Sequence, residues 1–168
     1  LANYNLAKLA LVPMYMVMTA TQVAWLPHLF SLKDPKDAMR QTIKTMKIAF
    51  FFMIIATPLV SLAIYLALIN NFIGSDYSVV PKIIIYASIG VIASMLLHLN
   101  SNMFVYLKKT KYQFGIGLII LIINLSVNIL LIPNYSFYGA TVAAGLANLT
   151  GLGVGLFLLI RMTKNNKG

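Results

Sequence analysis

Long apolar runs without a charged residue alternate with short clusters of cations along this chain of 168 residues. Four such runs occur, and the last is interrupted by the turn-forming residues 133–136. Because a helix of about 20 residues crosses the roughly 30 Å hydrocarbon core of a bilayer, the pattern predicts five membrane-spanning helices. The predicted spans cover approximately residues 9–31, 48–70, 83–107, 112–132 and 139–160.

The composition excludes an ordinary soluble protein. Hydrophobic residues make up 60% of the chain and charged residues only 10%, whereas soluble domains have about 25% charged residues. Alternation of polar and apolar residues over strand-sized segments is missing, so a transmembrane β-barrel fits poorly. Helices satisfy every backbone amide within one segment in lipid, so we predict an all-α polytopic membrane helix bundle.

The cations between the runs predict an orientation. Five lie between residues 33 and 47, one at Lys82, three between residues 108 and 111, none in the fourth connection, and three between residues 161 and 167. Since positively charged loops stay in the cytoplasm, the N-terminus of this segment is expected outside and its C-terminus inside. The net charge of +10 then indicates anionic lipid headgroups as partners. Cations dispersed over three loops do not favour nucleic-acid binding.

The first basic connection has the pattern of a short amphipathic helix. Asp34 is placed to cap its N-terminus and Pro35 to occupy its first position. Cations recur at spacings of four, four and three, and a second stripe of apolar residues lies beside them. We therefore expect residues 35–46 to form a helix on the inner membrane surface. This helix would serve either as an anchor or as a site that gathers a phosphorylated lipid.

Polar residues inside the spans are the candidates for a transport path, because each must find a partner or face water. Ser94, His98 and Asn102 recur every four residues, so the third span has a polar face. Interhelical hydrogen bonding is the structural alternative for any single residue. The candidates for the substrate path are Lys8, Gln22, His98, Asn102, Asn124 and Asn128.

The sequence offers no catalytic or metal-binding constellation. Cysteine and glutamate are absent, and the acids Asp34, Asp37 and Asp76 all lie in connections between spans. His98 has neither a second histidine nor a carboxylate at ligand spacing. We therefore expect a protein that is not an enzyme and that uses no cofactor or metal. A membrane transferase with His98 as base stays the less favoured alternative, because it lacks an acid partner.

Two features of the spans concern packing and bending. Small residues repeat at a spacing of four on the last span, and such a ridge lets helices approach closely in lipid. Close packing is the favoured role of this ridge, and a hinge or conduction role is the alternative. Pro13 and Pro58 each remove a backbone hydrogen bond, so bends are expected in the first two spans. The ridge comprises Gly139, Ala143, Ala147, Gly151 and Gly155.

Two segments resemble the multidrug/oligosaccharidyl-lipid/polysaccharide flippase superfamily, which is MATE-like, and within it the Wzx-like repeat-unit flippases. Residues 127–135 followed by 138–144 resemble the family's junction "N-x-x-L-I-P-x-Y-G-x-x-G-A-A-x-A". Residues 1–9 resemble its "G-x-Y-s-x-A-x-k-l" stretch, with Ala2 in place of the usual glycine. The resemblance implies helices 8–12 of a two-lobed transporter. A preceding N-terminal lobe is then expected elsewhere in a longer chain, as the absence of an initial methionine also suggests.

The resemblance implies a function. The expected activity is flipping of an undecaprenyl-diphosphate-linked oligosaccharide across the bacterial cytoplasmic membrane for cell-surface polysaccharide synthesis. The alternatives within the superfamily are a drug antiporter and a flippase for a peptidoglycan precursor. A cation exporter would need buried carboxylates, and the aspartates of this chain lie in connections instead, so an anionic or neutral cargo is favoured.

Overall fold

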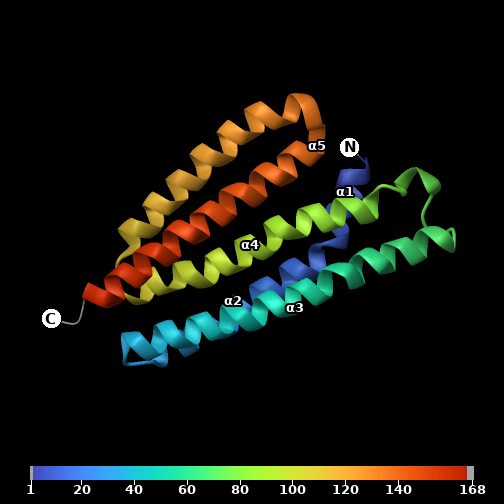
Figure 1. Ribbon diagram of the computed structural model, residues 1–168. Helices are drawn as coiled ribbons and strands as arrows, with labels where there is room; N and C mark the ends of the chain where they lie inside the picture. The colour runs from blue at the N-terminus through green and yellow to red at the C-terminus, as the bar shows by residue number, and fades with distance from the viewer. Residues whose placement is uncertain (1, 166–168) are drawn as a thin grey trace.

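The computed structural model describes residues 2–165, and the described part is an all-helical bundle of long, closely aligned helices (Figure 1). Lys167, one of the predicted inner cations, and Leu1 lie outside the described residues. A short 3₁₀ turn, η1, separates α3 from α4. In chain order the elements are α1 (Ala2–Ala10), α2 (Val12–Ser31), α3 (Pro35–Ile69), η1 (Ser75–Tyr77), α4 (Val80–Tyr106) and α5 (Thr110–Asn165).

The helices are long and apolar enough to make a polytopic membrane protein. Between residues 2 and 165, four segments qualify as spans on their own, and the bent pair α1–α2 makes a fifth. The predicted fold class is therefore confirmed. The α1–α2 pair bends by 40° next to Pro13, as expected from a residue that lacks a backbone amide hydrogen. Pro58, in contrast, lies inside α3 without ending it.

The structure corrects the prediction of a separate surface helix over residues 35–46. α3 runs without interruption from Pro35 to Ile69, so the basic segment extends the axis of the second span. Asp34 caps this helix as expected, because its Oδ1 accepts a hydrogen bond from the Lys36 amide at 3.0 Å. Neither glycine nor proline separates the basic stripe from the apolar stretch that follows, and nothing therefore stops the helix between them.

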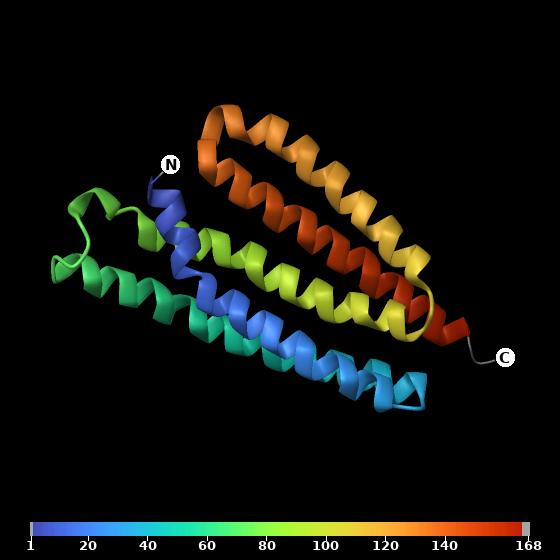
Figure 2. The same ribbon diagram turned by 180° about the vertical axis from the view of Figure 1, so that it is seen from behind.

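α5 is a helical hairpin with two antiparallel arms, residues 110–136 and 138–162 (Figures 1 and 2). The reversal occurs at Ser136, whose φ of 50° and ψ of −130° leave the helical region. The predicted turn at residues 133–136 is thus compressed into its last residue. Pro133 lies inside the first arm, one turn before the reversal.

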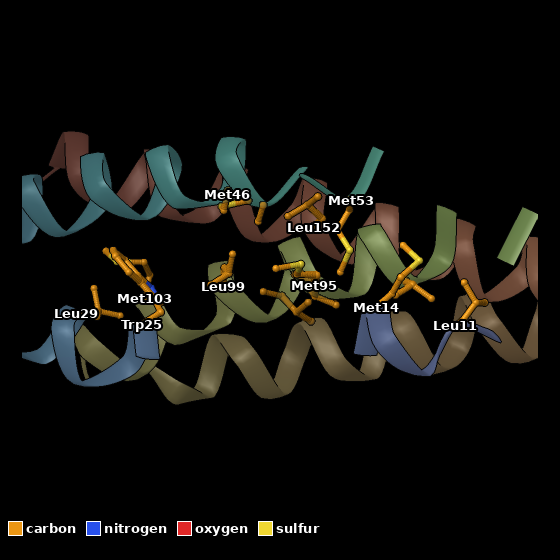
Figure 3. Packing of buried hydrophobic residues seen from close by; sticks show 14 of the residues in the cluster. Leu11, Met14, Trp25, Leu29, Met46, Met53, Met95, Leu99, Met103 and Leu152 are labelled. Carbon is orange, nitrogen blue, oxygen red and sulfur yellow. The ribbon is translucent and has the colours of Figure 1, made fainter. Parts of the chain in front are cut away.

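The core is built around α4, which contacts α1, α2, α3 and α5. Six of the nine methionines are buried, and several of them fill the space between α2, α3 and α4 (Figure 3). Methionine is unbranched and flexible, so it can fill irregular gaps between helices. Tyr106 closes one end of this core by donating a hydrogen bond to the Leu32 carbonyl at 2.8 Å. At the other end, Ser61 donates to the Pro81 carbonyl at 3.1 Å.

Candidate functional site

A pocket of about 160 Å³ with polar and apolar lining lies where α1, the start of α2, α4 and the second arm of α5 meet. Its polar lining comes from all of these elements, and Ala87, Gly90 and Ala144 add small apolar surface. We call it the Lys8 pocket. Its polar residues are Tyr4, Lys8, Tyr15, Ser94, Thr141 and Asn148.

Lys8 provides the positive charge of this pocket. It lies in the last turn of α1, and its Nζ is 4.8 Å from the centre of the Tyr4 ring, a cation–π contact. The break at Leu11 and the 40° bend that follows bring α1 against α4. Lys8 is exposed and lies just before the predicted first span, so its ammonium group is accessible to an anion in this pocket.

Asn148 is a pocket residue that sequence reasoning missed. Its Nδ2 donates a hydrogen bond to the Gly90 carbonyl of α4 at 3.4 Å. The helices approach closely here because Gly90 and Gly145 face each other without side chains. The sequence contains one sign of this role, since Asn148 is a polar residue within an apolar span and lies next to the small-residue ridge.

The polar face of α4 continues beyond the pocket. α4 is unbroken, so Ser94, His98 and Asn102 share one face, as their spacing predicted. His98 is exposed and Asn102 half-buried, and neither makes a hydrogen bond with a described residue. Gln22 of α2 is half-buried, and its Nε2 is buried without a hydrogen-bond partner among the described residues.

The structure does not bring the two asparagines of the fourth predicted span to this site. Asn128 Nδ2 donates a hydrogen bond to Asn124 Oδ1 at 2.6 Å within the same helix, whereas Asn128 Oδ1 is buried without a partner among the described residues. Both lie on the first arm of α5, which is on the far side of the second arm from α1 and α2 (Figures 1 and 2). Their predicted contact with cargo would therefore need a surface separate from the Lys8 pocket.

All five residues of the small-residue ridge are buried in the second arm. A Cβ on Gly139 would lie 2.7 Å from the backbone carbonyl of Leu131 in the first arm. Gly151 faces Ile120 of the first arm, while Gly155 leaves room for the Asn100 side chain of α4. The ridge thus lies at the contacts of the second arm with both of its neighbours.

The chemistry of the Lys8 pocket is that of a binding site. Hydroxyl and amide groups can donate to and accept from a hydroxylated ligand, and one ammonium group can pair with an anion. No carboxylate belongs to the residues that line it. Among the residues that the structure describes, no group of three histidines, aspartates or glutamates could hold a metal ion. The arrangement can therefore bind an anionic or hydroxylated group beside α4.

Comparison with known proteins assigns a family. The family model described as "Lipid II flippase MurJ" matches residues 2–168, nearly the entire chain. No curated protein and no solved structure matches. The match supports the flippase superfamily of the sequence resemblance and a role in transport, but it does not extend to the Wzx-like branch. This polytopic helical chain therefore belongs to the lipid II flippase MurJ family of membrane flippases.

Proposed function

We propose that this protein flips a lipid-linked peptidoglycan precursor, lipid II, across the bacterial cytoplasmic membrane. The family match over residues 2–168 carries this proposal. The match favours a peptidoglycan precursor over a polysaccharide repeat unit as the cargo. Both cargoes consist of a glycan joined through a diphosphate to an isoprenoid lipid.

The Lys8 pocket supports a cargo of this chemistry. A diphosphate is an anion, and the ammonium group of Lys8 can form charge-assisted hydrogen bonds with it. Ser94 and Asn148 offer neutral donors and acceptors of the kind that bind sugar hydroxyls. The isoprenoid chain would stay in the bilayer, beside the exposed apolar faces of the helices. The N-terminal lobe that the resemblance implies would form the opposite wall of the path.

The test uses cells that are depleted of their own lipid II flippase and express the full-length protein. We expect growth to be restored and lipid II to become accessible at the outer leaflet. A parallel strain lacks its polysaccharide repeat-unit flippase. Lipid II retained on the inner leaflet, despite normal insertion of the protein, would contradict the proposal. Rescue of the second strain alone would favour the Wzx-like activity instead.

The orientation proposed from the loop cations has its own test. The chain contains no cysteine, so single cysteines can be introduced at two exposed positions at opposite ends of the bundle, Asp76 in η1 and Lys111 in the first turn of α5. We expect a membrane-impermeant maleimide to label Asp76→Cys in intact cells and Lys111→Cys only after the cells are opened. The reverse labelling pattern would invert the proposed orientation.

A further inference from the structure

A second, larger pocket lies between the end of α2 and the first turns of α3. Its volume is about 600 Å³, within the range of small-molecule binding sites. Thr45 and Ile48 complete its lining on the side of the apolar part of α3. We call it the basic pocket. Its other lining residues are Trp25, His28, Asp37, Arg40, Gln41 and Lys44.

Side chains from both helices fix the walls of the basic pocket. His28 Nε2 and Gln41 Oε1 are 2.6 Å apart, and this hydrogen bond joins α2 to α3. The ring of His28 also packs on that of Trp25, with 5.3 Å between their centres. The Asp34 cap fixes the start of α3 a few residues before the pocket. The pocket is therefore held by contacts that do not use its two cations.

Those two cations are free to bind an anion. Arg40 and Lys44 are one helical turn apart and both are exposed, so they present positive charge on one face of α3. Neither forms an ion pair or a hydrogen bond with any residue that the structure describes. Asp37 is the one carboxylate of the lining, and it offsets only part of their charge.

Trp25 forms part of the wall of the pocket. It lines the pocket yet is only 7% exposed, and it belongs to the buried cluster drawn in Figure 3. Its indole Nε1 is buried and has no hydrogen-bond partner in residues 2–165. An indole N–H can only donate, and buried donors are nearly always paired. Because this nitrogen is shielded from solvent, a ligand in the pocket does not reach it.

We propose that the basic pocket binds the phosphate group of an anionic membrane lipid. Phosphate oxygens accept hydrogen bonds and carry the charge that Arg40 and Lys44 can neutralise. The location favours a lipid over a soluble phosphate. The pocket lies at one end of the α2 and α3 spans, where headgroups lie, and exposed Ile48 and Phe51 continue from it along α3 as a surface for an acyl chain. The site is separate from the Lys8 pocket, and the proposal does not depend on which cargo is flipped.

The experiment measures lipid binding to the delipidated full-length protein by native mass spectrometry. Phosphatidylglycerol is added to wild type and to Arg40→Gln/Lys44→Gln. We expect binding to the double variant to be about tenfold weaker, since each cation near anionic headgroups adds to the attraction. Trp25→Phe keeps the aromatic wall and removes only an N–H group that the pocket does not reach, so we expect binding within about twofold of wild type. Arg40→Lys/Lys44→Arg should bind nearly as well as wild type.

The matched control is Lys36→Gln/Lys47→Gln, which removes the same charge from the same helix at residues that do not line the pocket. We expect it to bind within about twofold of wild type, because charge outside the pocket acts only through the screened surface field. Equal losses in the two double variants would show non-specific attraction and overturn the proposal. Inorganic phosphate is tested in parallel. If it bound with the same dependence on Arg40 and Lys44 while phosphatidylglycerol did not, free phosphate would replace lipid as the ligand, and the proposal would also fail.

Discussion

The two arms of α5 share one chain reversal but have different environments. We compare one apolar stretch of 18 residues from each arm. Within the described structure, 39% of the stretch is buried in the second arm and 6% in the first. The second arm presents Gly139, Ala143 and Ala147 to its neighbours, whereas the first presents large side chains such as Leu121, which is 61% exposed. Both arms are apolar enough to span a membrane. The exposed arm is the more apolar of the two, with a mean hydropathy of 2.6 against 1.9, so small side chains and not greater hydrophobicity accompany close packing.

The same contrast governs the polar residues of the two arms. Asn148 of the second arm donates across the helix interface to α4, and Asn100 of α4 donates back to the Leu152 carbonyl at 3.5 Å. Asn124 and Asn128 of the first arm bond to each other. Asn148 on the packed arm thus joins two helices, while the two asparagines of the exposed arm bond within their own helix. The following variants test this contrast.

The largest effect is expected from Gly139→Ala in the packed arm. The new methyl group would lie 2.7 Å from backbone atoms of Leu131, which cannot rotate away. We expect the free energy of unfolding to fall by about 1–3 kcal/mol, as in other overpacked interiors, seen as a lower Tm of the purified protein in detergent. Gly153→Ala is the control on the same arm, because nothing lies within 4 Å of its added Cβ. It should raise stability by about 0.5–1 kcal/mol through helix propensity, and equal effects at both sites would refute the ridge as a packing surface.

The turn that leads into the exposed arm offers an intermediate effect. Lys108 has a φ of 55° at the C-terminus of α4, where the Lys109 amide bonds to the Phe104 carbonyl at 2.8 Å. This left-handed position favours glycine, so Lys108→Gly should increase the free energy of unfolding by about 1 kcal/mol. Lys109→Gly removes the same charge at a residue without a positive φ and should be neutral or destabilising. A higher Tm for both variants would indicate charge repulsion as the cause instead.

The smallest effect concerns the asparagine pair of the exposed arm. In a double-mutant cycle of Asn124→Leu and Asn128→Leu, we expect a coupling energy of about 0.6 kcal/mol, typical of hydrogen bonds within membranes. The double variant should be nearly as stable as wild type, because it removes both partners of the hydrogen bond at once. The cycle is measured by thermal unfolding in detergent. Loss of transport by a stable double variant would show that this pair contacts cargo after all.

Much of the fold could be predicted from the sequence, because apolar run length and loop charge depend on local residues alone. The helices, the Asp34 cap and the bend near Pro13 all follow from such local signals. The continuity of α3 was missed, since its amphipathic start resembles a surface helix and only the absence of a helix-breaking residue distinguishes the two.

The candidate site was predicted only in part. Lys8 and the polar face of α4 were identified, because a charge at the entry of an apolar span and a periodic polar stripe within one both stand out. Asn148 and the close approach of Gly90 to Gly145 depend on which helices meet, and that pairing is not encoded in one span. For the same reason, the distance between the Asn124–Asn128 pair and the Lys8 pocket could not be read from spacing.

The most direct test of the account measures lipid II translocation by the full-length protein carrying Lys8→Gln. We expect at least about a tenfold lower rate, because a charge-assisted contact to the diphosphate is lost, and recovery of most of the rate in Lys8→Arg. Lys82→Gln is the matched control, since this exposed lysine does not line the pocket. A wild-type rate for Lys8→Gln, at normal levels of inserted protein, would contradict a role for the Lys8 pocket in moving the cargo.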